Sequence, residues 1–424
     1  MTTATLFNNA KKQLLAALLP FLALCAMLAG APAWAVEGVI ATIPTGYGPY
    51  GIAINSATNK IYVTNQYSGS VTVIDGVTNS ATSVAVGFRP VNIAVNPITN
   101  KIYVAQSDGF ITVIDGASNS TSTIAAGSYR GRILVNPVTN KIYVMNRSEG
   151  LTVIDGATNS TITLEMINGN PDTIVLNPVT NKIYVASDNY NTLTEIDGVS
   201  NSTTTVALGD IAHAIAINPV TNKIYVAHYF SNSISVIDGI THNTTMVAVG
   251  RSPEDVEVNQ VTNKIYVGNY DDSSVTVIDG VTNNTITVAV SGRYPTVIAA
   301  NSVTNKIYVG SYFDDYVTVI DGASNSTTTL AVGRCYSYLG GIEVNPVTNL
   351  AYVVNSVNNT VTVIGDTPTA PPAPALRSQS KCNQGVGNGS EGCDPGKSHL
   401  LNPFGSNDES GGTPGKPGRM GGNK

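Results

Sequence analysis

The chain of 424 residues repeats one short string, Asn-Lys-Ile-Tyr-Val, at nearly constant spacing. A second string, Val-Ile-Asp-Gly or a close variant, follows the first seven copies. The spacing of 40 to 44 residues is typical of four-stranded propeller blades and is too short for a Kelch blade. The first string begins at Asn59, Asn100, Asn140, Asn181, Asn222, Asn263 and Asn305, with an altered copy at Asn349, and the aspartates of the second are Asp75, Asp115, Asp155, Asp197, Asp238, Asp279 and Asp321.

Each unit is predicted to form four β-strands. In the second unit these are Ile93–Asn96, Lys101–Ala105, Ile111–Asp115 and Thr121–Ala125, rich in Val, Ile, Thr and Tyr and separated by Asn-Pro, Asp-Gly and Gly-x-x-Pro segments. Both faces of these strands are largely apolar, which suits a blade packed between two others. The repeats lack helical periodicity, which excludes a helical solenoid, and a β-helix needs shorter coils.

The strand count predicts an all-β fold, an eight-bladed β-propeller over residues 36–366. Sets of inner, second and third strands occur eight times, from near Ile52 to near Ile364. The outer strands are shifted, because the first one, Val39–Ile43, precedes any inner strand and none follows Ile364. Pairing of this first strand with the last blade would close the ring and remove the free sheet edges. Seven blades is the alternative, if the altered last unit does not join the ring.

The repeat resembles a known family. Lys-Ile-Tyr-Val-Thr-Asn at 60–65, followed by Ser-Val-Thr-Val-Ile-Asp-Gly at 70–76, is similar to the YVTN-type β-propeller repeat of archaeal surface-layer proteins and exported bacterial propellers. The likeness covers residues 39–364. It implies a propeller fold and export, but it implies little about function, since propellers serve as scaffolds, binders and enzymes.

Residues 1–35 have the layout of a secretory signal peptide. A basic stretch at Lys11 and Lys12 precedes an apolar run from Leu14 to Ala29, and Ala33-Trp34-Ala35 supplies small residues for cleavage after Ala35. A retained membrane anchor is the alternative, although the run is short for a spanning helix. No later stretch is apolar enough to span a bilayer. We therefore expect a protein that is secreted, at the cell surface or in the periplasm.

The composition changes after the last repeat. Residues 367–376 are predicted to form a stiff proline-rich linker. Residues 377–424 are rich in Gly, Asn and Ser, have few apolar residues, and are predicted to be disordered. In an oxidising compartment Cys382 and Cys393 would form a small disulfide loop, which leaves Cys335 unpaired.

Charge and missing signatures narrow the function classes. Only 12% of residues are charged and the net charge is -6, which gives no electrostatic reason to expect a nucleic-acid partner. Haem-attachment, nucleophile-elbow and phosphate-loop motifs are absent from the sequence, so we expect no cofactor.

Comparison of the eight units separates two sides of the predicted ring. Turns that join the inner to the second strand, and the third to the outer strand, lie on one side and are nearly identical in every unit. Their Asn and Asp residues suit Asx turns and positive φ. The repeated Lys and Asp, such as Lys60 and Asp75, are expected to form structural ion pairs within each blade.

Loops on the opposite side differ in every unit, and arginine and tyrosine are concentrated there. These two residue types give large, rigid contact area and directed hydrogen bonds, which is why they gather at binding surfaces. We predict that they surround the mouth of the central channel and bind an anionic or sugar-like ligand or an acidic peptide. The candidate binding residues are Arg89, Arg130, Arg132, Arg251, Arg293, Arg334, Tyr47, Tyr50, Tyr129, Tyr294, Tyr336 and Tyr338.

A few residues break the repeat pattern in ways that suggest chemistry. His213 and His228 are expected to face each other across a hairpin, where they would bind a metal or act as acid and base, but no third ligand is evident. Glu195, Glu257 and Glu343 replace apolar residues of strands. A carboxylate in such a place needs a partner or has a raised pKa.

These features lead to one functional hypothesis and two alternatives. The first is an exported, non-enzymatic propeller that binds an envelope polymer, a glycan or a protein through its Arg/Tyr-rich loops. The alternatives are a metal-assisted lyase or hydrolase of the propeller type and a structural surface-layer component. A monomeric ring is expected, with self-association left open.

Overall fold

The strands of this protein were located in a computed structural model, which describes residues 35–368 apart from 128–131, 147–149, 166–170, 188–190, 313 and 335–340. Strands β1 to β32 and one 3-10 turn, η1 (Tyr270–Asp272), make up the regular structure of this part. No helix among these residues has the length and apolarity needed to cross a membrane.

The strands of the first four blades are β2 (Pro49–Asn55), β3 (Lys60–Asn65), β4 (Ser70–Asp75), β5 (Ala81–Ala85), β6 (Pro90–Asn96), β7 (Lys101–Gln106), β8 (Phe110–Asp115), β9 (Thr121–Ala125), β10 (Ile133–Asn136), β11 (Lys141–Asn146), β12 (Gly150–Asp155), β13 (Thr161–Leu164), β14 (Pro171–Asn177), β15 (Lys182–Ser187), β16 (Thr192–Asp197) and β17 (Thr203–Ala207). Those of the last four are β18 (Ala214–Asn218), β19 (Lys223–His228), β20 (Ser233–Asp238), β21 (Thr244–Ala248), β22 (Pro253–Asn259), β23 (Lys264–Asn269), β24 (Ser274–Asp279), β25 (Thr285–Ala289), β26 (Pro295–Asn301), β27 (Lys306–Ser311), β28 (Tyr316–Asp321), β29 (Thr327–Ala331), β30 (Ile342–Asn345), β31 (Leu350–Asn355), β32 (Thr360–Pro368) and β1 (Ala35–Pro44).

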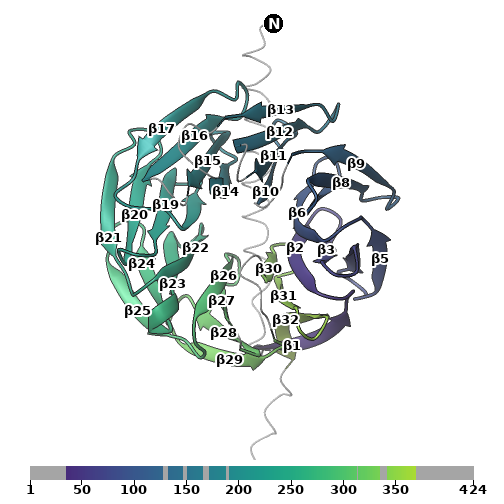
Figure 1. Ribbon diagram of the computed structural model, residues 1–424. Coiled ribbons are helices and arrows are strands. Elements are labelled where there is room, and N and C mark those ends of the chain that lie inside the picture. Colours follow the sequence, from purple (N-terminus) through teal and green to yellow (C-terminus); the bar gives the residue numbers. More distant parts are fainter. Residues whose placement is uncertain are drawn as a thin grey trace, which may run out of the picture. The chain divides into compact units, whose positions relative to one another are not determined.

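The strands form eight four-stranded antiparallel sheets, arranged as blades in a ring (Figure 1). Seven blades use four consecutive strands, whereas the eighth has the order β1-β32-β31-β30. The predicted eight-bladed ring, closed by the N-terminal outer strand, is therefore confirmed, and the seven-bladed alternative is wrong. The altered last unit joins the ring because its strands keep the repeated Tyr and Val residues that pack between blades.

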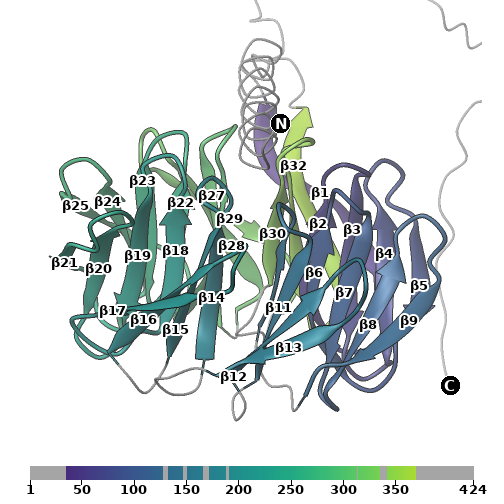
Figure 2. The same cartoon turned by 90° about the horizontal axis from the view of Figure 1, so that it is seen from above.

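The closing pair is longer than predicted. Ala35 pairs with Pro368, so β1 begins four residues before Val39 and β32 includes Thr367, the first residue of the predicted linker. Figure 2 shows the two strands rising together beyond their neighbours. The pair can extend this far because no tight turn joins β1 to β32, which come from opposite ends of the propeller sequence. Residues 1–34 of the predicted signal peptide and the predicted disordered tail lie outside the described residues, whereas Ala35, the last residue of that predicted peptide, begins β1.

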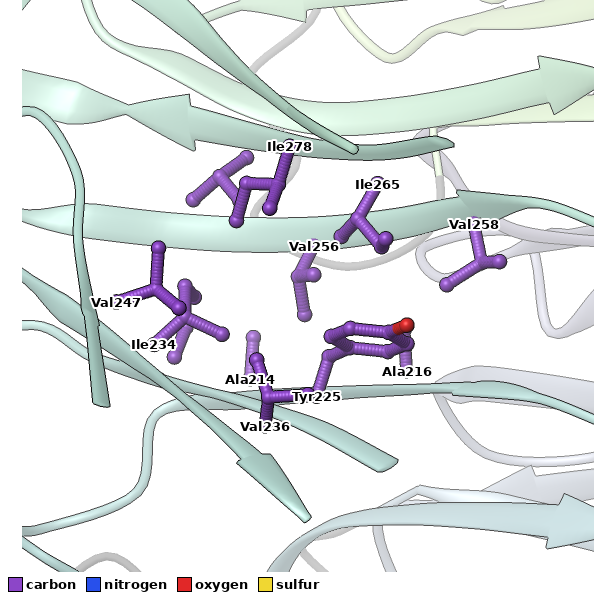
Figure 3. Packing of buried hydrophobic residues seen from close by; sticks show 12 residues of the cluster. Ala214, Ala216, Tyr225, Ile234, Val236, Val247, Val256, Val258, Ile265 and Ile278 are labelled. Atoms are coloured by element: carbon purple, nitrogen blue, oxygen red, sulfur yellow. The ribbon is translucent and has the colours of Figure 1, made fainter. Parts of the chain in front are cut away.

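The hydrophobic core consists of eight clusters, and each lies between two neighbouring blades. Figure 3 shows the cluster between blades five and six, where Tyr225 and Val236 pack against Val256 and Ile265. Both faces of each blade are thus buried, which explains why the strands lack the alternation of a sheet with one wet face. The eight repeated tyrosines are each fully buried in these clusters.

Neighbouring blades are also linked by a repeated hydrogen bond between asparagines. The inner strand of each blade ends in a buried asparagine whose Nδ2 donates to the asparagine that precedes the second strand of the next blade. In blade five, Asn218 donates to Asn263 at 2.7 Å, while its Oδ1 accepts the backbone N–H of Val220 at 3.0 Å. The last link, from Asn345 to Asn59, closes the circle at 2.7 Å.

The turns themselves follow the predicted Asx chemistry. Asp75 Oδ1 accepts the backbone N–H groups of Val77 and Thr78, at 3.0 Å and 2.9 Å. Asn59 adopts a φ of 51°, and the repeated asparagines at equivalent positions are also left-handed. Gly76 packs so closely here that a Cβ would lie 2.4 Å from Asn59 Oδ1, so this position requires glycine.

The repeated Lys and Asp do not pair as predicted. Lys60 lies opposite Asp75 in the strand register, but its Nζ donates to the carbonyl of Gly116 in the next blade at 3.0 Å. The lysine therefore links two blades and does not form an ion pair within its own blade. The turn bonds occupy only Oδ1 of the aspartate, in Asp75 as in Asp321, so they do not decide the partner of the lysine. The carbonyl that the next blade supplies decides it.

The seventh blade shows what happens when that carbonyl is missing. The eighth blade has Gly365 in place of the aspartate and forms no such turn. Lys306 then pairs with Asp321 of its own blade at 2.7 Å, and Glu37 of β1 accepts the hydroxyl of Tyr308. Among the described residues, this is the one repeated Lys–Asp pair of a single blade at ion-pair distance.

Replacement of Asn218 by Ala should lower the free energy of unfolding by about 2 kcal/mol, because Asn218 is fully buried and its loss removes hydrogen bonds to polar groups of two blades. Urea denaturation measures this change. Asn243→Ala, on an exposed turn of the same blade, is the control and should change it by less than about 0.5 kcal/mol. Equal losses in both variants would contradict a role for the asparagine link.

Candidate functional site: the loop face and the channel

The side of the ring that carries the variable loops is called the loop face here, and the side that carries the repeated turns is called the turn face. Loop-face residues connect second to third strands or lead from an outer strand to the next inner strand. Their side chains are therefore placed by the ends of the blades. Two groups of aromatic residues stand out on this face.

The first group lies over blades one and two. Tyr47 precedes β2, Tyr67 follows β3 and Arg89 precedes β6. The rings of Tyr47 and Tyr67 are 5.3 Å apart, and the Arg89 guanidinium lies 5.9 Å from the Tyr67 ring centre. Tyr47 and Tyr67 are 64% and 60% exposed, so this group presents aromatic surface to solvent.

The second group forms an arc over blades five, six and seven. The rings of His213 and Tyr229 are 5.3 Å apart, and Tyr229 and Tyr270 are 6.4 Å apart. Tyr270 then stacks on Tyr294 at 4.4 Å. Tyr294 adopts a φ of 62°, which is unusual for an aromatic residue and turns its ring toward the loop of the preceding blade.

The remaining described arginines differ in their surroundings. Arg251 is exposed and forms an ion pair with Asp272 at 2.6 Å. Arg293 and Arg334 are also exposed, and their backbone N–H groups donate to Asp314 and Asn358.

Arg132 is half-buried and lies at the channel mouth. Its positive charge acts on three groups there, which are Tyr50, His213 and Asp255. Burial raises the pKa of Tyr50, and the charge of Arg132 partly offsets this rise. The inner strands of different blades thus bring a mixed set of charges together around one opening.

Several predicted residues cannot be placed. The candidate binding residues Arg130, Tyr129, Tyr336 and Tyr338 lie outside the described residues, as do the cysteines Cys335, Cys382 and Cys393. The binding role of the whole set stays a prediction.

His213 is held by a carboxylate that sequence reasoning did not single out. Its Nε2 lies 3.0 Å from Glu254 of the next blade. Burial opposes protonation of His213, but the hydrogen bond and charge of Glu254 outweigh it, so its pKa is raised above the ordinary 6.5. The signal was available, because Glu254, Asp255 and Glu257 place three carboxylates in one inner strand.

His228 has a structural role. Its Nδ1 donates to the Ile211 carbonyl at 3.0 Å, which leaves Nε2 to accept the Ser235 hydroxyl at 2.7 Å. The side chain is fully buried. Most other blades have an amide at this position, as Asn65 bonds to Thr72 in blade one. The strand register is the predicted one, with Ile217 opposite Ile224 and Ala214 opposite Ala227. His213 and His228 are hydrogen-bonded to separate partners.

Across the described residues, no group of three or more His, Cys, Asp or Glu side chains is placed to hold a metal ion. Glu195 instead has protein partners, as its burial requires. Its carboxylate bonds to Lys182 and lies 3.1 Å from Nε2 of His242 in the next blade. His242 occupies a left-handed turn position where most blades have Asn, so the two exceptions to the repeat compensate each other.

Aliphatic residues line one side of the channel. A cavity of about 400 Å³ lies against the inner strands β2, β6, β10 and β30, and its lining is mostly aliphatic. Glu343 is the charged residue of this lining. Enclosure by the ring raises its pKa to about 7. Glu257 also has a pKa well above its ordinary value, because of burial and then the charges of Asp255 and Glu343.

If Glu254 raises the pKa of His213, Glu254→Gln should lower that pKa, as measured by NMR titration of the imidazole. The stability that protonated His213 contributes is present below pH 6.5 and is lost as the pH rises through its raised pKa. His228, whose pKa burial lowers, serves as the internal control and should not move. An unchanged His213 titration would contradict the pairing.

Glu343→Gln should raise the Tm relative to the wild type more at pH 8 than at pH 5. The folded protein favours the neutral carboxyl, so the benefit of protonation is present below about pH 4.5 and is lost as the pH rises through about 7. Glutamine cannot ionise and avoids that loss. Thermal unfolding at both pH values measures the difference, and an equal change in Tm at both would contradict a raised pKa.

Comparisons with known proteins place the fold but no family. No protein-family model matches the chain, and no curated protein matches it. The dihydro-heme d1 dehydrogenase NirN in complex with DHE matches with a TM-score of 0.62 and 14% identity, over 77% of this chain and 75% of that chain.

Two further solved structures are similar. Hydrazine synthase of Kuenenia stuttgartiensis matches with a TM-score of 0.52 and 17% identity, over 76% of this chain and 96% of that chain. The computationally designed Ika8 protein matches with a TM-score of 0.64 and 13% identity, over 77% of this chain and 99% of that chain. At these identities the likeness shows the propeller fold alone.

Proposed function

We propose that the protein is an exported, non-enzymatic propeller of the YVTN type, and that its loop face binds an envelope polymer, a glycan or a protein partner. The supporting observation is the gathering of aromatic and guanidinium groups from several blades on that face. Tyr67 with Arg89, and the stacked pair Tyr270 and Tyr294, are the centres of the two groups.

The chemistry of this face suits a sugar-like or acidic ligand. Tyrosine offers a large rigid surface at a low cost in side-chain entropy, and arginine binds carboxylates and other planar anions with two parallel hydrogen bonds. Tyr50 and Arg132 extend the same set of groups to the channel mouth. The variable loops differ between blades, as expected when one ligand contacts each blade differently.

The bonds of the two histidines favour this function over a metal-assisted lyase or hydrolase. Such an enzyme would need His213 and His228 to act together, and they are bonded to Glu254 and to Ile211 with Ser235 instead. We therefore propose no metal cofactor. We also propose no nucleic-acid partner, because the net charge is -6. The proposed location is outside the cytoplasm, secreted, at the cell surface or in the periplasm.

The test is a binding screen of the purified protein against isolated cell-wall, exopolysaccharide and envelope-protein fractions. Combined replacement of Tyr47, Tyr67 and Arg89 by Ala, or of Tyr229 and Tyr270 by Ala, should weaken binding at least about tenfold. Ile286→Ala, on the exposed outer strand β25, is the matched control and should leave binding unchanged. Binding to no fraction, or an equal loss in the control, would contradict the proposal.

A further inference from the structure

The turn face carries a repeated set of exposed aliphatic side chains. One follows each Asn-Pro or equivalent pair between inner and second strand, and another follows each Asp-Gly pair between third and outer strand. All of these positions are exposed, and the Val and Ile residues among them range from 39% to 81% exposed. The first set is Ala57, Ile98, Val138, Val179, Val220, Val261, Val303 and Val347, and the second is Val77, Ala117, Ala157, Val199, Ile240, Val281 and Ala323.

The turns do not require these side chains. In each turn the residue uses its backbone, as when the N–H of Val77 donates to Asp75 Oδ1 and the N–H of Ile98 donates to Asn96 Oδ1. The side chain points away from this bond into solvent, where Val77 is 81% exposed and Ile98 66%. Polar and glycine residues usually fill such turn positions.

The residues at these positions vary between Ala, Val and Ile but are never polar. The units therefore differ from one another at these positions but keep an aliphatic residue, although contact with water alone would favour a polar one. A contiguous exposed aliphatic surface on one side of a protein marks an interaction site.

The charges on the same face favour a second copy of the chain as the occupant. Five of the seven repeated lysines donate to a carbonyl in the Asp-Gly turn of the next blade, as Lys223 Nζ does to the Gly280 carbonyl at 2.8 Å. Lys182 and Lys306 pair instead with Glu195 and Asp321 of their own blades. The repeated Lys and Asp thus alternate around the ring, seven of each, and cancel in net charge. A face with alternating and balanced charges can be complementary to an identical face, which is what a two-fold interface requires.

The same composition is poorly suited to a lipid surface. Membrane-interface binding relies on Trp, Tyr or Phe and on excess Lys and Arg. The repeated aliphatic positions of the turn face hold no aromatic residue, and its repeated charges are balanced. Interfaces between identical subunits, by contrast, have apolar centres.

We infer that two copies of the protein associate through their turn faces. The loop faces then point in opposite directions, so one dimer presents two binding faces. The β1–β32 ribbon rises from the turn face at blade eight, and it limits how the two rings are rotated against each other.

The test is sedimentation velocity of the purified protein over about 1 to about 100 µM. We expect the wild type to shift from monomer to dimer over this range. Combined replacement of Val220, Ile240 and Val281 by Lys should weaken association at least about 100-fold. These side chains are 75%, 80% and 79% exposed, so the variant should fold normally, which an unchanged Tm would verify.

The matched control adds the same charge elsewhere. Phe88, Phe230 and Ile286, exposed on the loop face and outer rim, are replaced by Lys, and association should persist. A dimer that survives the turn-face variant, or that is lost equally in the control, would overturn the inference. A wild type that stays monomeric up to about 100 µM would also overturn the inference. In that case, a flotation assay with phosphatidylcholine vesicles would show whether the turn face binds lipid instead.

Discussion

Contact between neighbouring blades is the constraint on which this structure depends. A blade has two apolar faces and cannot bury either of them alone, so each must pack against another blade on both sides. The aliphatic and tyrosine clusters supply most of this burial. The buried asparagine of each inner strand adds a directional link, because it bonds to its own turn and to the next blade at once. The circle closes when Asn345 reaches Asn59.

Departures from the repeat are informative because the other units show what each position normally does. His228 stands where most blades have an amide and makes equivalent buried hydrogen bonds. Glu195 and His242, one blade apart, replace an apolar residue and a turn residue with a bonded pair. These substitutions are matched by local partners and have structural explanations. Glu257 and Glu343 of the inner strands differ, because neither is paired with a basic side chain of the described residues at ion-pair distance and both have raised pKa values.

The two sides of the ring have been shaped by different requirements. On the turn face, one Asx geometry recurs in every blade and brings aliphatic residues to the surface in a regular pattern. On the loop face, length and composition change from blade to blade, and half-exposed aromatic rings from different blades lie next to one another. The uniform side suits contact with an identical surface, and the variable side suits contact with something unlike the protein itself.

The sequence by itself determined the all-β fold, the number of blades, the closing role of the first strand and the chemistry of the turns. These follow from local patterns repeated at constant spacing, and repetition removes the ambiguity that a single strand pattern leaves. The partner of Lys60 was decided by the tertiary structure, because a carbonyl of the next blade lies nearer than the aspartate beside it in register. The Tyr270–Tyr294 stack and the Glu254–His213 pair were likewise settled only in three dimensions, since each joins residues of different blades whose distance depends on how the blades are rotated around the ring.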